Sequence, residues 1–513
     1  MLRRSFLAFT AAATLAFAAF PGVASAQGAD VTLKAATNAE PDVLDIQLAG
    51  DPPADFITLQ NVFEQPWGWT YDGKLKETVA KIDVSPDRKT ITFHVHPGVK
   101  FSSGDELTGA DIKFSWDRYK AKSRWAGRHA QFIDHVDAPD KYTAVFHFSR
   151  PDVGFFGGGG VYVESKAYFD RVGEKEASTH PIGFGPYSIG DYKPGQYLDL
   201  KRFDGYYGGK PEVKSARIFF VADDNTRIAK LKAGEVDIIT SPPYPEIAGL
   251  KKDGYNIAEL PAHPTINVQF HTWNPTVPWY KQKVRLAIAH AIDADAIVKN
   301  LLAGVPTRYA FLAPGEFGYD PTLKPYSYDP ALAKKLLAEA GYPNGFTMPL
   351  YYTSVAYYGI KQTVEAVVLY LQQVGIKADV HAMDQMQILK MLFSIGGDKT
   401  GNYVGVTAMP AANVGLATMD TITLAYWGGG PGRIKPAWHN EAFDQVVTQA
   451  INTVDDEKRS DLIKQAVRIL HDDVGVVPLW NSVYVYASDK SLHYKVVEHR
   501  LPALRLADIT MTK

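Results

Sequence analysis

Residues 85–119 read SPDRKTITFHVHPGVKFSSGDELTGADIKFSWDRY, and two different periodicities follow one another in this stretch. From Thr90 to His96 apolar and polar residues alternate, which predicts a strand with one buried face. The tetrapeptide Thr108-Gly109-Ala110-Asp111 then opens a helical pattern that continues through Phe114, Trp116 and Tyr119. The stretch therefore predicts a strand followed closely by a helix.

The same mixture extends outward along the chain. Asp329, Pro330 and Gly341 predict a helix that is capped at Asp329 and ends before Gly341. The apolar stripe Val284, Ile288, Ile292, Ile297 and Leu301 predicts one helix that ends at Gly304. Further helices are expected at 224–233, 443–451 and 461–470, and strands at 31–36, 142–148, 236–239 and 376–380. Helices and strands that mix throughout place the chain in the α/β class.

Composition excludes several classes of function. The 513 residues include 54 basic and 56 acidic residues, so the formal net charge is −2 and gives no basic excess for nucleic acid or a membrane surface. Hydrophobic residues make up 46%, as in a soluble globular protein. Cysteine is absent, which excludes disulfides, thiolate metal sites, cysteine nucleophiles and a lipidated-cysteine anchor.

The N-terminus has the pattern of a secretory signal peptide. Arg3 and Arg4 precede an apolar stretch from Phe6 to Phe20, which is short for a bilayer span, and the small-residue site Ala24-Ser25-Ala26 follows. We expect residues 1–26 to be removed and the protein to reach the periplasm. The paired arginines leave the Sec and the twin-arginine export routes both open.

Catalytic and cofactor motifs are missing from the sequence. The glycine tracts 157–160 and 428–433 lack the Lys-Ser/Thr that follows a phosphate-binding loop, and neither Gly-x-Ser-x-Gly nor His-Glu-x-x-His occurs. His94 and His96 share one strand face, but spacing identifies no third metal ligand. We therefore expect no enzyme activity, no cofactor and no resident metal.

Five segments in order resemble the family 5 extracellular solute-binding proteins, the peptide/nickel/opine branch of ABC-transporter receptors. They are AEPDVLD at 39–45, the quoted stretch at 85–119, a region at 183–239 that includes GFGPYSI and TRIAKLKAGEVDII, VRLAIAHAIDADAIVKNLLAG at 284–304, and YSYDPALAKKLLAEAGYPNGF at 326–346. The resemblance covers about residues 31–495. One departure is His96, where the family usually has Arg or Lys.

The resemblance implies a two-lobed periplasmic-binding-protein fold of type II, cluster C-like, with an extra subdomain in the first lobe. Lobe I would comprise residues 27–68, 183–262 and 480–513, the extra subdomain 69–182, and lobe II 263–479. Hinge crossings then fall near 262 and 480. A solute would bind between the lobes of a monomer and favour the closed form, which the ABC transporter permease in the inner membrane recognises.

The resemblance also indicates the kind of ligand. Dipeptide receptors of the family hold the ligand's ammonium group with an aspartate, and Met409 stands near that position here. The arginine that holds the peptide carboxylate corresponds to Lys361 or Gln362, and a lysine still offers a cation. The implied ligand is therefore an opine, a sugar conjugate or a modified peptide. Aromatic and basic side chains expected near the cleft are Trp67, Trp69, Trp125, Arg128, Tyr357, Tyr358, Tyr403, Tyr426, Trp427 and Arg433.

Two alternatives remain open at this point. A secreted hydrolase would explain the signal peptide, although it would need a nucleophile or metal motif that is missing. A receptor of the same family for a metal chelate or haem would use histidines, with His94, His271, His381 and His439 as the candidates.

Overall fold

The computed structural model describes residues 31–49, 59–69, 75–123, 132–151, 155–156, 162–314, 316–353, 358–383, 387, 391, 399–409, 438–495 and 504–511. The expected signal peptide, residues 1–26, lies outside these ranges. No helix within them combines the length and the apolar character that a membrane span needs.

A ten-stranded sheet runs through the whole molecule. In spatial order its strands are β14 (Ile376–Met383), β13 (Phe346–Thr353), β15 (Val404–Met409), β12 (Asn256–Phe270), β16 (Val476–Ser488), β11 (Ile238–Thr240), β1 (Val31–Thr37), β10 (Val213–Phe220), β9 (Tyr197–Arg202) and β8 (Tyr187–Lys193). The first lobe is the part built on β1 and β8–β11, and the second lobe is the part built on β13–β15. The two-lobed α/β architecture expected from the sequence is confirmed.

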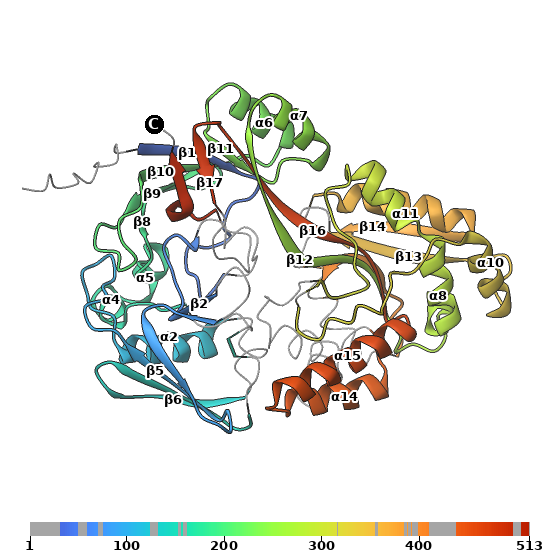
Figure 1. The fold of residues 1–513 in the computed structure, drawn as a ribbon, viewed down its shortest axis with the longest axis horizontal. Coiled ribbons are helices and arrows are strands. Elements are labelled where there is room, and N and C mark those ends of the chain that lie inside the picture. The colour runs from blue at the N-terminus through green and yellow to red at the C-terminus, as the bar shows by residue number, and fades with distance from the viewer. Residues whose placement is uncertain are drawn as a thin grey trace, which may run out of the picture.

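The long strands β12 and β16 connect the two lobes. They pair antiparallel from Asn256↔Ser488 to Gln269↔Val476, and Figure 1 shows both crossing from one half of the molecule to the other. β16 also pairs with β11 of the first lobe, whereas β12 also pairs with β15 of the second. The paired strands β12 and β16 therefore link the lobes within one sheet.

Each part of the molecule has its own hydrophobic core. In the second lobe α8 (Gln282–Ala291), α10 (Pro330–Glu339) and α11 (Ile360–Gln373) contribute to one core together with β13 and β15. A smaller core lies between α14 (Glu441–Ile451) and α15 (Asp456–Asp472). The first-lobe strands enclose a third, and α6 (Asp224–Lys232) and α7 (Ile247–Lys252) cover a fourth.

The quoted stretch forms part of a separate four-stranded sheet in the order β4-β5-β7-β6, with α2 (Gly109–Lys122) packed against it. The strands are β4 (Ala80–Val84), β5 (Thr90–Val95), β7 (Thr143–Phe148) and β6 (Ile133–Asp140). The alternation in β5 is confirmed, because Ile91, Phe93 and Val95 are buried in the core of this extra subdomain. Two hairpins, β2 (Trp67–Trp69) with β3 (Leu75–Glu77) and β17 (Leu492–Tyr494) with β18 (Ile509–Met511), and the helices α4 (Lys166–Val172) and α5 (Glu174–Thr179) complete the main elements.

Most predicted elements are confirmed, but the long helix over 284–304 is wrong. α8 ends at Ala291, and Ile292 has an extended backbone. Asp293 then caps a new short helix, α9 (Ala294–Ala296), because its Oδ1 accepts a hydrogen bond from the amide of Ala296 at 2.8 Å. The apolar stripe thus continues across a break that the cap imposes.

A buried ionic cluster joins the extra subdomain to the first lobe. The guanidinium of Arg118, on α2, donates to Asp45 at 2.9 Å, to Glu164 at 3.0 Å and to Glu174 at 2.9 Å. Asp45 and Glu164 are both about 1% exposed. Burial, together with the charge of Asp45, raises the pKa of Glu164 to about 8. At neutral pH Glu164 is therefore largely protonated, and Arg118 mainly neutralises the buried charge of Asp45 while donating to Glu164.

Replacement of Arg118 with alanine is expected to lower the free energy of unfolding by about 3–5 kcal/mol, because it leaves the buried Asp45 without a cation and the buried Glu164 without its hydrogen-bond donor. Lys113→Ala on the same helix is the control, since Lys113 forms an exposed pair with Asp117 at 2.8 Å and its loss should cost under about 1 kcal/mol. Urea unfolding of the mature protein measures both changes. Equal losses in the two variants would contradict the role given to Arg118.

Candidate ligand site between the lobes

In the first lobe, three parallel strands end at one edge of the sheet. β1 pairs in parallel with β10 and β11, so Thr37, Phe220 and Thr240 share an edge. Thr37 and Thr240 are at most 1% exposed, and the hydroxyl of Thr240 has no partner within the described part of the chain. Open α/β sheets bind ligands at the carboxyl ends of their strands.

The second lobe has a matching edge. β13 pairs in parallel with β14 and β15, so Thr353, Met383 and Met409 end on the same side. Thr353 is 1% exposed, and its hydroxyl is also without a partner among the residues that the structure describes.

These two edges face each other along β16. Met409 is paired with Thr265, and Thr265 with Asn481 of β16, whereas Thr240 is paired with Tyr486. β15 therefore ends level with Asn481 and β11 ends level with Tyr486, and the two strands run toward each other. The edges are separated by five residue steps along β16, from Asn481 to Tyr486, or roughly 16 Å. That spacing suits a small peptide or a similar solute held between the lobes.

Two tyrosines meet across this space. Tyr244, in the turn after β11, holds its hydroxyl between the carbonyl and amide of Val483 on β16, at 2.9 and 3.1 Å. Tyr358, at the start of α11, packs edge-on against it with ring centroids 5.2 Å apart. Burial raises the pKa of both phenols, so they are neutral at physiological pH. The pair supplies an aromatic surface at the junction of the lobes.

The N-terminus of α11 opens onto the second-lobe edge. The N-cap residue is Gly359, which has no side chain to cap the helix, and the positive end of a helix is suited to an anion. Lys361 lies in the first turn of α11 and is exposed, and no described carboxylate lies within ion-pair distance of it. A positive end of a helix and a lysine thus lie at the same edge.

Close packing fixes the position of this helix end. Gly359 has φ 89°, and a Cβ there would approach Leu302 Cδ2 to 2.6 Å and the Trp480 ring to 3.6 Å. The Trp480 indole, fully buried on β16, donates to Thr363 Oγ1 at 3.1 Å. The start of α11 therefore rests directly on one of the two connecting strands.

The structure brings Tyr358, Lys361 and the backbone of Met409 to this edge. Trp67 lies elsewhere, 3% exposed in the extra subdomain core, where it packs on Phe93 and Phe155. Tyr403 is 2% exposed and precedes β15, at the opposite end of that strand, where it stacks on Tyr351. For these two rings, burial indicates packing. The other predicted site residues lie outside the part of the chain that the structure describes. They are Trp125, Arg128, Tyr357, Tyr426, Trp427, Arg433 and the side chain of Trp69.

The histidines suggested for a metal-chelate or haem receptor do not converge. His94 pairs with Asp83 on the extra subdomain, and His381 pairs with Asp379 on β14. His271 is buried and bonds the carbonyl of Gly401, whereas His439 stacks on Trp273. Each has a local partner.

Sequence reasoning missed Thr240, Thr353, Tyr244 and Trp480. The two threonines carried a usable signal, because each directly ends an apolar strand at its carboxyl end. No sequence signal identifies Tyr244 and Trp480, because only the strand pairing reveals that they lie at the junction of the lobes.

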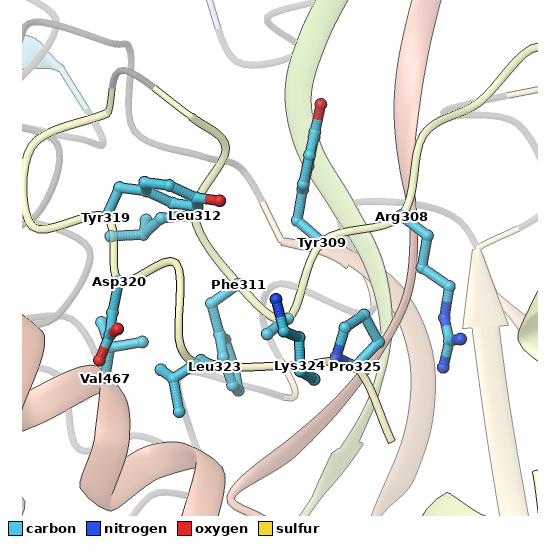
Figure 2. A pocket seen from close by; sticks show the side chains of 11 residues that line it. Arg308, Tyr309, Phe311, Leu312, Tyr319, Asp320, Leu323, Lys324, Pro325 and Val467 are labelled. Atoms are coloured by element: carbon cyan, nitrogen blue, oxygen red, sulfur yellow. The ribbon is translucent and has the colours of Figure 1, made fainter. Parts of the chain in front are cut away.

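A cavity of about 170 Å³ lies apart from this edge, between the segment 308–325 and α15 (Figure 2). Its charged residues already have partners: Arg308 pairs with Asp295, Asp320 with Arg468, and Lys324 bonds the carbonyl of Pro321. It is also smaller than the roughly 300–1,000 Å³ of typical ligand pockets. The sheet edges are therefore the better candidate site.

Comparison with known proteins agrees with this geometry. The family model of the bacterial extracellular solute-binding proteins, family 5 (middle region), matches residues 69–405. The chain belongs to this family. It is the solute-binding receptor of an ABC importer, and the secreted-hydrolase alternative is not favoured.

Individual relatives support the assignment. The glutathione-binding protein GsiB of Escherichia coli (strain K12) is 30% identical over 442 residues, which cover 84% of this chain and 86% of GsiB. AgaA of A. tumefacien R10, solved with agropinic acid, has a TM-score of 0.78 and 26% identity, covering 94% and 99% of the two chains. DppA of Helicobacter pylori, solved with the peptide STSA, has a TM-score of 0.81 and 23% identity, covering 94% and 98%.

Replacement of Gly359 with alanine is expected to lower the free energy of unfolding by about 2–4 kcal/mol, because left-handed strain is added to a clash with Leu302 and Trp480. Gly341→Ala is a matched control. Gly341 has φ 94°, but the nearest atom to an added Cβ is the flexible Lys281 Nζ at 4.0 Å, so only strain of about 1–2 kcal/mol remains. Thermal and urea unfolding of the two variants separate strain from packing. If the two losses were the same, close packing would not fix this helix end.

Proposed function

We propose that this receptor binds an anionic, peptide-like or opine-like solute between the two sheet edges and delivers it to the permease subunits of its importer. The observation that carries the proposal is the exposed Lys361 beside the uncapped N-terminus of α11. A lysine and the positive end of a helix together favour a carboxylate.

The sequence around the site argues against an ordinary dipeptide. A ligand ammonium group enclosed between the lobes needs a carboxylate partner, because an unpaired charge loses several kcal/mol on leaving water. Met409, which stands near the position of the family's ammonium-binding aspartate, offers no such charge. The preferred ligand therefore carries a carboxylate and has no free α-amino group near Met409.

The relatives are consistent with an acidic ligand. GsiB is named as a glutathione-binding protein, and AgaA was solved with agropinic acid. By analogy, we include opine acids in the proposed range, together with glutathione-like peptides whose free amino group, on the γ-glutamyl residue, lies away from Met409. A sugar conjugate with an acidic group would satisfy the same charge requirement.

Lobe closure completes the proposed mechanism. The lobes have the boundaries given above, and the hinge lies near residues 262 and 480. The β12–β16 pairing changes register between Pro261 and Thr265, and proline lacks an amide hydrogen for the ladder. The interruption lies between the two edges, where bending would bring them together. We further propose that the protein acts in the periplasm as a monomer after removal of residues 1–26.

Lys361→Ala should weaken the binding of an acidic ligand by about 1.5–3 kcal/mol, because it removes a charged hydrogen bond. Lys361→Arg should keep most of the affinity. Lys377→Ala is the control, since Lys377 is exposed near the amino end of β14, away from the carboxyl edge of the same sheet. Titration calorimetry with glutathione and opine acids measures the changes. Unchanged affinity of Lys361→Ala for a ligand that the wild type binds would contradict the anion contact.

Ala-Ala and N-acetyl-Ala-Ala form a test of the missing ammonium partner. They share a carboxylate and differ in the amino group, so the acetylated peptide should bind more tightly to the wild-type receptor. In Met409→Asp the order should reverse, because this position would then carry the carboxylate with which the family's dipeptide receptors hold the ammonium group. Micromolar or tighter binding of unmodified dipeptides to the wild type would show that the charge argument is wrong.

A further inference from the structure

The extra subdomain carries two histidines and an aspartate on the solvent face of its sheet. His135 and Asp137 belong to β6, and His147 lies opposite His135 on the neighbouring β7. Their three potential ligand atoms lie within 4.8 Å of one another. This cluster lies in the extra subdomain and has no part in the ligand site between the lobes.

A β-bulge creates the cluster. Ile133 is paired with Phe148, but the next register pair is His135 with His147, so Asp134 is an extra residue on β6. Without this insertion Ile133, His135 and Asp137 would share one face of the strand. With it, Ile133 is 3% exposed in the core, while His135 and Asp137 point to solvent beside His147.

The distances fit a tetrahedral metal ion. His135 Nε2 and His147 Nε2 lie 3.5 Å and 3.4 Å from Asp137 Oδ2. Zinc bound at about 2.0–2.1 Å by nitrogen and oxygen ligands has its ligand atoms about 3.4 Å apart at the corners of a tetrahedron. The two imidazole rings are stacked, with centroids 4.4 Å apart and planes inclined by 10°, so one of them must turn about its side-chain bonds for both Nε2 lone pairs to converge on one ion.

From this geometry we infer that His135, Asp137 and His147 form a zinc site. Two imidazoles and one carboxylate suit zinc, whereas magnesium and calcium require mostly oxygen ligands. The aspartate and His135 side chains are each 57% exposed and His147 is 34% exposed, so an ion has access and keeps an open coordination position toward solvent. The ion would tie the strand β6, at the edge of the four-stranded sheet, to β7.

Titration calorimetry of the untagged mature protein with ZnCl2 tests the inference, because a polyhistidine tag would bind zinc itself. The wild type should bind one zinc ion per chain, and MgCl2 and CaCl2 should give no such binding. His147→Gln and Asp137→Asn should each lose at least about tenfold in zinc affinity. Asp137 is exposed and His147 is half-buried outside the core, so both variants should unfold at the wild-type temperature in the absence of metal.

His94→Gln is the matched control. His94 lies on β5 of the same sheet and contacts Asp83 at 3.1 Å, but no second histidine joins that pair among the described residues. This variant should keep wild-type zinc affinity. Cobalt substitution provides a second readout, since a tetrahedral site should give strong visible absorption in the wild type and in His94→Gln only. Absence of stoichiometric zinc binding, or equal affinity in the wild type and His147→Gln, would overturn the proposal.

Discussion

The pairing of β12 with β16 is the constraint on which the rest of the structure depends. These two strands carry the ladder from the first lobe to the second, and each takes its other partner from a different lobe. As a result, the carboxyl ends of two sets of parallel strands face each other over roughly 16 Å. The candidate ligand site is a consequence of this topology, because neither lobe alone provides both edges. The proposed closure would bend the same two strands.

The side chains around the junction connect this hinge with the proposed anion contact. Trp480 belongs to β16, yet its indole is bonded to Thr363 of α11, and Gly359 allows the helix end to lie against its ring. Tyr244 is bonded to Val483 of β16 and contacts Tyr358 from the second lobe. Lys361 and the N-terminus of α11 are thereby held at a defined place relative to the connecting strands. In the proposed site, a ligand carboxylate would contact a helix that is anchored to one of them.

The sequence was sufficient for the fold but only partly sufficient for the site. Local patterns identify the strand Thr90–Val95, by its alternation, and the helix Pro330–Glu339, by its Asp329 cap. Both features depend only on residues that are neighbours in the sequence. The break at Ile292 was missed because Asp293 reads equally well as a solvent-facing helix residue. Trp67 and Tyr403 were expected at the cleft, since an aromatic residue in a core and one in a binding site look alike in sequence. The bulge at Asp134 and the pairing of Thr240 with Tyr486 are properties of the register, which only the folded sheet reveals.

The central claim is that a solute between the lobes holds them closed about β12 and β16. Small-angle X-ray scattering of the mature protein tests it most directly, with and without the tightest-binding solute at 100 times its Kd. Ligand occupancy is verified by calorimetry on the same samples. The radius of gyration should be smaller with ligand, because the two sheet edges approach each other. An unchanged radius in fully occupied protein would contradict the central claim.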